Sequence, residues 1–291
     1  MTGRTYKATG INLKAMPMGE ADRLVTVLTK ELGLIRAIAP GARKHKSRLG
    51  GRSGLFVINE LMLTRGKSLD KMIQAETQRS FPGLSRDLAR LTASQYLAEL
   101  ILCEAVSEQP QEALFYLLVE HLERLETAPS STVLACLAQA TFHILALGGV
   151  APELYQCCIT QQPIQPDLGN PNWRVGFSLS AGGTVELAEL SRIVTPRSFR
   201  AGEGGGKLEM KAELTAFELS LLQQLGRPEL VLNQAHSLPS IKGENSFPHQ
   251  LWRRIERILR HYAQYHFERP IRSAALIDTC FASPTYASER S

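Results

Sequence analysis

The first quarter of the chain contains an alternating stretch, Phe56-Val-Ile-Asn-Glu-Leu-Met-Leu-Thr64. Val57, Leu61 and Leu63 fall on one side of an extended backbone. Glu60 falls on the other side. Apolar residues at every second position are typical of a strand with one buried face. The stretch therefore predicts a strand over residues 56–64.

Similar stretches lie on both sides of it, and turn-forming segments such as Pro17-Met-Gly19 and Arg65-Gly-Lys-Ser68 separate them. The predicted strands are Tyr6–Leu13, Asp22–Thr29, Gly33–Pro40, Phe56–Thr64 and Lys71–Glu76. Five short strands within about 80 residues favour a small closed barrel, because closure leaves no unpaired strand edge.

Positive charge is concentrated in the same quarter of the chain. Residues 1–80 contain 15 Lys and Arg against 6 Asp and Glu, whereas the remaining 211 residues contain 18 against 22. The densest segment, Gly41–Arg52, carries five Lys or Arg and no acidic residue. A field of this kind attracts polyanions, and phosphate backbones are the commonest polyanion that a soluble protein meets. The charge distribution therefore indicates a nucleic-acid partner.

A basic run can also be a solvated loop between strands, but two features favour contact with nucleic acid. Further basic residues lie on the adjoining strands and turns, and glycines such as Gly50 and Gly51 let the backbone approach a phosphate closely. The predicted DNA-binding residues, taken as a set, are Arg36, Arg43, Lys44, Lys46, Arg48, Arg52, Arg65, Lys67 and Lys71.

Aromatic content predicts the mode of binding. Barrels that hold single strands by stacking use several aromatic side chains, each worth ~1–3 kcal/mol per base. Residues 1–80 contain only Tyr6 and Phe56. We therefore expect affinity to come mainly from phosphate contacts and counterion release, on single- and double-stranded DNA alike.

The pattern changes after Phe81-Pro82. From Leu84 to about Leu147 apolar residues recur at three- and four-residue intervals, which predicts helices. The same period returns over Leu214–Leu225 and Trp252–Phe267, whereas residues 152–206 read as irregular. We divide the chain into a barrel (1–80), a helical domain (81–155), an irregular segment (156–206) and C-terminal helices packing on the helical domain (207–291).

Chemistry-bearing motifs are sparse. The five cysteines are scattered, which favours a reducing compartment without a disulfide framework. Cys157-Cys158 is the one local cysteine cluster, but Thr160 stands where a C-x-x-C pair needs its second thiol. We predict no catalytic residue, no metal and no cofactor. A secretory signal and a run of 18 apolar residues are also missing, so we expect a cytoplasmic protein that does not bind membranes.

Several stretches together resemble the RecO family of recombination mediators. They include Gly19-Glu-Ala-Asp-Arg-Leu-Val-Thr-Val-Leu-Thr29, Gly33-Leu-Ile-Arg-Ala-Ile-Ala-Pro-Gly-Ala-Arg43, Gly148-Gly-Val-Ala-Pro-Glu-Leu154 and Leu259-Arg-His-Tyr-Ala-Gln-Tyr-His266. The resemblance covers most of the chain in the right order. It implies an α+β protein with an OB-fold barrel followed by a helical domain. It also implies a non-enzymatic role: annealing complementary strands, binding single-stranded-DNA-binding protein and working with RecR to load RecA.

Many members of that family carry a zinc ribbon with two C-x-x-C pairs. Here Cys157 matches the first ligand and Thr160 replaces the second, while Glu186 and Glu189 stand where the other pair would follow. The resemblance therefore implies a degenerate, zinc-ribbon-like segment held by packing alone.

We thus predict a DNA-binding recombination mediator. The principal alternative is an RNA-binding, translation-associated OB-fold protein, because a barrel with a basic loop suits RNA equally well. Two further alternatives are a DNA-modifying enzyme with ligands from distant positions and a scaffold that binds acidic proteins.

Overall fold

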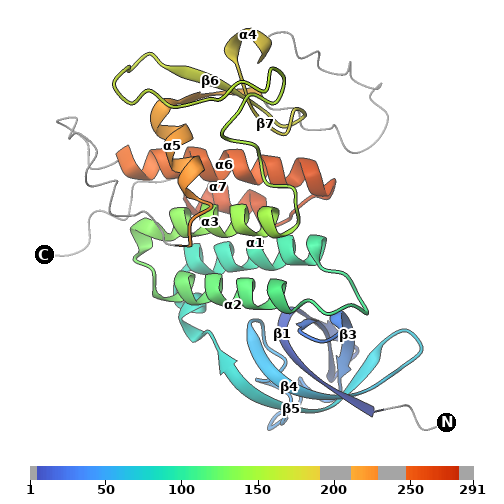
Figure 1. Cartoon of the computed structure of the whole chain (residues 1–291). Coiled ribbons are helices and arrows are strands. Elements are labelled where there is room, and N and C mark those ends of the chain that lie inside the picture. Colours follow the sequence, from blue (N-terminus) through green and yellow to red (C-terminus); the bar gives the residue numbers. More distant parts are fainter. Residues whose placement is uncertain (1–4, 191–210, 229–246, 282–291) are drawn as a thin grey trace, which may run out of the picture. The chain divides into compact units, whose positions relative to one another are not determined.

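The protein has a mixed α+β architecture in this computed structural model, which describes residues 5–190, 211–228 and 247–281 (Figure 1). An N-terminal sheet of five strands precedes the helices, as the sequence predicts. The chain divides into two compact units, one of residues 1–130 and 272–280 and one of residues 131–271 and 281–291. The boundary between the units at residues 130 and 131 falls inside the predicted helical domain (81–155). The division into four domains drawn from the sequence stays a prediction.

The five strands of the first unit close on themselves. Their order is β1-β2-β3-β5-β4, with β4 pairing back onto β1. All neighbours are antiparallel except β3 and β5, which pair in parallel at Ala37–Asp70 and Ile38–Lys71. The strands are β1 (Thr5–Met18), β2 (Asp22–Thr29), β3 (Gly33–Ala39), β4 (Val57–Thr64) and β5 (Asp70–Ser80).

Alternating apolar residues fill the inside of this barrel. Side chains such as Val25, Val27, Leu61 and Leu63 are fully or almost fully buried, and outward neighbours such as Glu60 are exposed. Burial of each such aliphatic side chain contributes about 1.5–3 kcal/mol. From Asn59 to Leu63 burial follows a period of two, as the sequence predicts. Before that the pattern breaks, because Ile58 is buried although it lies on the Glu60 side, and the strand begins at Val57 instead of Phe56.

The connection between the first two long helices is bound to the β2–β3 turn. Within this connection, the Val106 carbonyl accepts a hydrogen bond from the Leu34 N–H at 3.0 Å, and the Glu108 N–H donates to Leu32 at 2.9 Å. Gly33 has a φ of +66°, and a Cβ there would lie 2.0 Å from the Val106 carbonyl oxygen. Only glycine fits this close approach, which fixes the helices of the first unit to its barrel.

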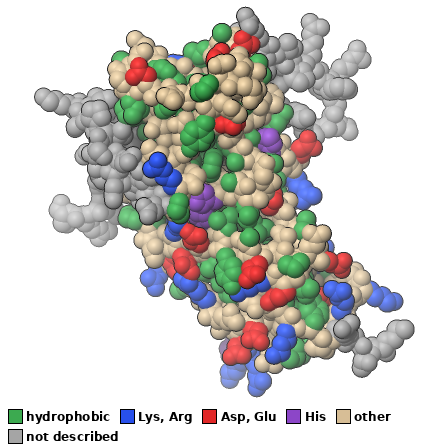
Figure 2. All heavy atoms as spheres, in the orientation of Figure 1, with side chains coloured by type: hydrophobic (Ala, Val, Ile, Leu, Met, Phe, Trp, Pro, Cys, Tyr) green, Lys and Arg blue, Asp and Glu red, His purple; other side chains and the backbone are tan. Residues whose placement is uncertain are grey.

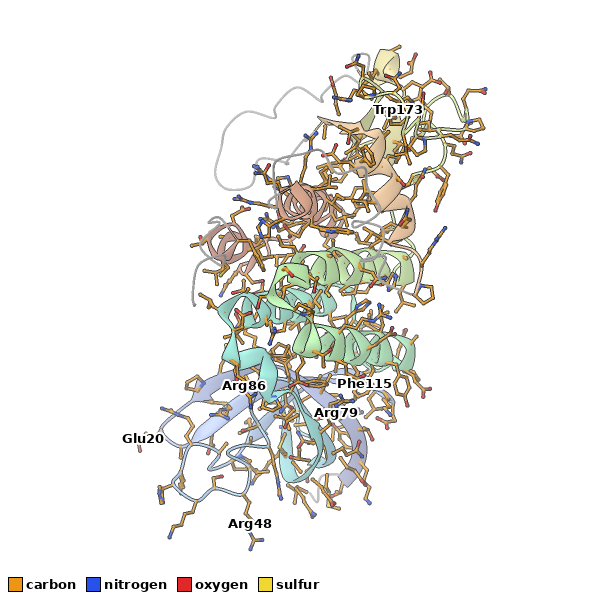
Figure 3. All side chains as sticks on the ribbon, turned by 90° about the vertical axis from the view of Figure 1, so that its left-hand side faces the viewer. Glu20, Arg48, Arg79, Arg86, Phe115 and Trp173 are labelled. Carbon is orange, nitrogen blue, oxygen red and sulfur yellow. The ribbon has the colours of Figure 1, made fainter. Side chains whose placement is uncertain are left out.

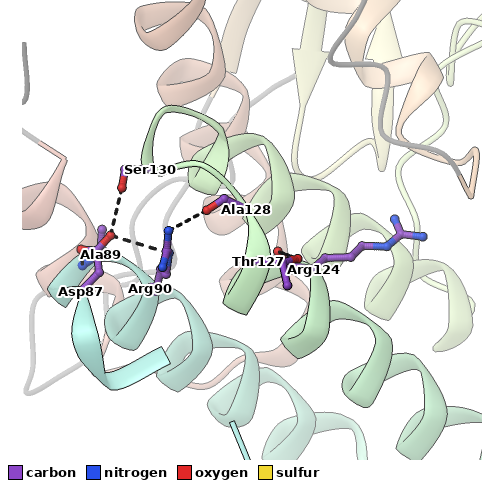
Figure 4. Close-up of polar contacts among 7 residues, drawn as sticks. All are labelled: Asp87, Ala89, Arg90, Arg124, Thr127, Ala128 and Ser130. Atoms are coloured by element: carbon purple, nitrogen blue, oxygen red, sulfur yellow. Dashed lines mark hydrogen bonds and ion pairs between the residues drawn. The ribbon is translucent and has the colours of Figure 1, made fainter. Parts of the chain in front are cut away.

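The helical elements of the first unit are η1 (Pro82–Arg86), α1 (Leu88–Glu104), α2 (Glu112–Thr127) and α7 (Ala274–Cys280). Helix α1 packs against α2 and α7. Asp87 caps α1 by accepting a hydrogen bond from the Ala89 N–H at 2.9 Å, and Arg90 donates to the Ala128 carbonyl at 2.7 Å (Figure 4). Side-chain capping of this kind stabilises a helix by about 1 kcal/mol.

The second unit contains α3 (Val133–Leu147), α5 (Ala216–Gln224) and α6 (Phe247–Phe267), and α6 packs on α3. The short helix α4 (Leu187–Leu190) follows strand β7. By length and composition, Ser130–Leu147 could cross a membrane, but most of this stretch is buried inside the protein, as in the core helix of a globular domain.

A small antiparallel sheet corrects one expectation from the sequence. Residues 152–206 read as irregular, yet β6 (Arg174–Ser178) lies between β7 (Gly183–Val185) and β8 (Lys211–Thr215). Val175 and Phe177 are buried beneath it. The sequence signal is weak because β7 is short and β8 joins from outside the segment. Residues 191–206 lie outside the described residues.

Candidate nucleic-acid interface

Eight of the nine predicted DNA-binding residues have exposed side chains, and Arg52 is half-buried. Five of the nine lie in the connection between β3 and β4, which we call the basic loop (residues 40–56). Arg65 and Lys67 lie in the β4–β5 connection, Arg36 lies on β3, and Lys71 lies at the start of β5. Lys and Arg side chains project from the lower end of the barrel in Figure 2, and Arg48 extends away from it there in Figure 3.

The basic loop is folded onto the barrel. Its buried residues Ala42 and Leu49 belong to the apolar core of the barrel. Consecutive turns link its backbone, including Lys44 N–H to Gly41 and Ser47 N–H to Lys44 at 3.0 and 3.1 Å. The loop therefore holds its cations on a scaffold of fixed shape, and their ordering on binding costs less entropy than in a free chain.

Polar side chains from the strands anchor the second half of this loop. The amide nitrogen of Asn12, which is fully buried, donates to the carbonyls of Arg52 and Gly54, both at 2.8 Å. Buried Asn59 donates to the same Arg52 carbonyl at 2.8 Å. Arg23 donates to the Gly50 carbonyl at 3.0 Å. Sequence reasoning missed these anchors, although an Asn in the middle of an apolar strand is a signal that could have indicated them.

Arg43 anchors the first half of the loop. Its guanidinium donates to the Gly19 carbonyl at 3.0 Å, and its N–H donates to Ala21 at 2.8 Å. Both acceptors lie in the β1–β2 turn. Arg43 therefore has a positioning role in addition to its charge.

Most acidic side chains of the barrel are occupied by local hydrogen bonds. Asp22 accepts from the Gly41 N–H at 2.7 Å, Asp70 from the Gly66 N–H at 3.0 Å and Glu31 from the Thr9 N–H at 3.0 Å. Glu60 pairs with Lys7 at 3.5 Å. Among the described residues none of the nine predicted cations forms an ion pair with a carboxylate, so their charges remain available to a polyanion.

Tyr6, Arg65 and Asp70 form a small polar group beside the β4–β5 connection. The Tyr6 hydroxyl donates to Asp70, and the Arg65 guanidinium lies 5.8 Å from the centre of the Tyr6 ring. Burial and the hydrogen bond to Asp70 raise the pKa of the Tyr6 hydroxyl, whereas Arg65 opposes the shift. This group holds the base of the β4–β5 connection, which carries Arg65 and Lys67.

The turn after Cys157 does not fit a zinc ion. The fully buried Cys157 Sγ accepts hydrogen bonds from the Thr160 and Glu186 N–H groups, both at 3.4 Å. A structural zinc site needs four ligands, and no group of three or more His, Cys, Asp or Glu able to hold a metal occurs in the described part of the chain. One thiol that accepts two backbone hydrogen bonds can hold this turn without a metal.

Two family models match the chain. The model described as "Recombination protein O N terminal" matches residues 1–81, which contain the barrel. The model described as "Recombination protein O C terminal" matches residues 85–275, which contain most of the helices and the small sheet. The two matches therefore support the family resemblance noted in the sequence, both in the barrel and in the helical part of the chain.

Curated proteins named "DNA repair protein RecO" are similar over nearly the whole length. The protein from Nostoc sp. is 51% identical, over 96% of this chain and 97% of the relative. The protein from Acaryochloris marina is 53% identical, over 96% of both chains. The protein from Gloeothece citriformis is 54% identical, over 95% of this chain and 97% of the relative.

Proposed function

Since the chain belongs to the RecO family of DNA repair proteins, we propose that it is a DNA-binding mediator that anneals complementary strands and assists loading of RecA. The observation that carries this proposal is the set of nine cations around the basic loop, the β4–β5 connection and the adjoining strands. They are unpaired with carboxylates among the described residues, while most barrel carboxylates have local partners.

The barrel supports assignment to the OB-fold. Five strands in the order β1-β2-β3-β5-β4, with one long strand β1 bonded to both β2 and β4, fit a five-stranded Greek-key barrel. OB-folds bind oligonucleotides on their strands and on the connecting loops. The basic loop and the β4–β5 connection are such loops, and they carry seven of the nine cations.

Annealing is a physical process to which these cations contribute directly. Two complementary strands repel each other through their phosphates, and Lys and Arg that neutralise phosphates release bound counterions and lower this repulsion. Pairing of bases breaks no covalent bond. We therefore infer a non-catalytic role for the protein in recombination and repair.

The proposed partners are single- and double-stranded DNA, RecR and single-stranded-DNA-binding protein. DNA contact is supported by the charge and geometry of the barrel, whereas the two protein partners follow from family membership alone. The proposed location is the cytoplasm, where bacterial DNA is repaired. The degenerate zinc-ribbon-like segment is also part of this proposal, supported by the Cys157 thiol, which accepts two backbone hydrogen bonds.

Charge reversal in the basic loop tests the proposal. We expect the variant with Arg43, Lys44, Lys46 and Arg48 changed to Glu to lose DNA binding and strand annealing. The matched control changes Lys14, Arg86, Arg269 and Arg272, all exposed and outside the predicted set, to Glu. The control variant has the same net charge as the loop variant, and it should retain most of the DNA binding and strand annealing. Annealing by a folded loop variant at the wild-type rate would refute the proposal.

A further inference from the structure

An open cavity of about 620 Å³ lies between the basic loop and the start of β5. Ser47, Arg48 and Leu49 line it from the loop, and Lys71, Met72 and Ile73 line it from the strand. The cavity brings together Arg48 and Lys71, two of the predicted DNA-binding residues. Its volume falls in the range of sites that hold small organic molecules, so it has room for one nucleobase.

The walls of the cavity combine apolar surface with positive charge. Ile73 is 50% exposed although it is a large aliphatic residue. Lys71 and Ile73 lie two residues apart on β5 with buried Met72 between them, so both side chains point outward on the same face. Pro40, the first residue of the basic loop, adds apolar surface, and no acidic side chain lines the cavity.

This combination matches one chemical class of ligand. A nucleotide of an unpaired strand has an apolar, planar base next to a negative phosphate. A bare anion would gain nothing from exposed Ile73, and a base pair within a duplex keeps its faces stacked on its neighbours. An exposed apolar side chain that shares a cavity with two cations therefore suits an unstacked base and its phosphates.

We propose that this cavity takes one unstacked base of a single DNA strand, with the base against Ile73 and the adjacent phosphates on Arg48 and Lys71. This inference rests on the proposed function, because it assigns a subsite within the same interface. Phosphate contacts are available to single and double strands alike, whereas the cavity adds affinity that only a single strand can use. The interface then binds unpaired strands more tightly than a duplex. When two strands anneal, the base leaves the cavity and this contact is lost.

The test compares two oligonucleotides by fluorescence anisotropy at one salt concentration. One is a thymidine oligonucleotide, and the other is an abasic strand with the same number of phosphates. We expect wild-type protein to bind the thymidine strand about 5-fold more tightly (~1 kcal/mol), because covering the exposed half of the Ile73 side chain recovers about half of the free energy of burying an isoleucine. Ile73→Gln should reduce this ratio to about 1–2, while affinity for a duplex stays unchanged.

Two control variants make the comparison specific. Ile73→Leu keeps the apolar wall and should keep the ratio. Met16→Gln removes a large side chain that is 40% exposed elsewhere on the barrel, and it should also keep the ratio. Equal wild-type affinity for both strands, or an unchanged ratio in folded Ile73→Gln, would overturn the base subsite. Because the loop-reversal variant tests phosphate binding separately, either failure would leave the proposed function standing.

Discussion

The Lys30 ammonium lies 2.8 Å from the hydroxyl oxygen of Tyr116, which joins the β2–β3 turn of the barrel to helix α2. The same ammonium stands 4.4 Å from the centre of the Tyr116 ring and 5.1 Å from that of Phe115. Phe115 lies where the barrel meets the helices in Figure 3. The hydrogen bonds on either side of Gly33 and this Lys30 contact together attach the α1–α2 connection and α2 to the β2–β3 turn. Within the first unit the helices therefore pack on the barrel and stabilise it.

Replacing Lys30 by Ala should therefore weaken this junction. We expect a loss of about 1 kcal/mol in the free energy of unfolding, since an exposed cation–π contact contributes about 0.5–1 kcal/mol. Chemical denaturation measures the change. Lys14→Ala is the matched control, because Lys14 is an exposed lysine of the same barrel. An equal effect of both substitutions would contradict the role assigned to Lys30.

The strands of the barrel were predictable because each has a local signature. Alternating burial, as at Leu61 and Leu63, and turn residues between the strands act over a few neighbours in sequence. The ends of β1 and β5 were not predictable in this way. β1 extends to Met18, through the Pro17-Met18 pair that reads as a turn, because its end pairs with the start of β2 in a tight hairpin, Met18 opposite Asp22. β5 extends to Ser80 because its end pairs with β4, which is distant in sequence, Ser80 opposite Val57.

The candidate interface was predictable in composition but not in construction. Charge density identified the basic loop, since exposed cations leave a compositional trace. The residues that anchor the loop are hard to find from composition. Asn12 and Asn59 reach the Arg52 carbonyl only once the barrel has folded, and they lie 40 and 7 residues from it in the sequence. The cavity beside Ile73 likewise depends on how the loop packs on β5.

Asn12 offers a direct test of how the loop is held. Asn12→Ala leaves the Gly54 carbonyl without this donor and the Arg52 carbonyl with Asn59 alone, which should cost about 1–2 kcal/mol of stability. The loosened loop should be cut faster by trypsin, because it contains several Lys and Arg. Asn170→Ala, at an exposed turn, is the control. Unchanged cleavage kinetics in Asn12→Ala would show that other contacts suffice to hold the loop.

Metal content tests the turn at Cys157. We expect purified protein to contain far less than one equivalent of zinc and to keep its melting temperature in the presence of a chelator. Cys157→Ala should lower stability by about 1–2 kcal/mol, because the Thr160 and Glu186 N–H groups lose their acceptor and a small cavity forms. Stoichiometric zinc in elemental analysis would contradict this account.

Acid should destabilise the second unit through two histidines of α6. Burial, together with Arg253, lowers the pKa of His249, and burial lowers the pKa of His266, whose ring centre lies 4.2 Å from that of Tyr262. The unfolded chain then binds protons more readily than the folded one, so stability falls as the pH drops below about 6.5.

The measurement is the melting temperature at pH 7.5 and at pH 5.5. The double variant His249→Gln, His266→Gln should show a smaller drop than wild type. His45→Gln, in the exposed basic loop, should show the wild-type drop. The same drop in the double variant would assign the acid sensitivity to other groups.

Salt dependence is the most direct measure of the electrostatic interface. If about five phosphates are neutralised, the logarithm of the DNA association constant should fall against the logarithm of salt concentration with a slope of about −4 to −5. Lys44→Ala should reduce the steepness by about 1 and weaken binding to all sequences alike, because an exposed lysine on the loop contacts phosphate and reads no base. Ile73→Gln should leave the slope unchanged, since it removes no charge. A wild-type slope shallower than about −1 would show that the cations of the barrel do not bind the phosphate backbone.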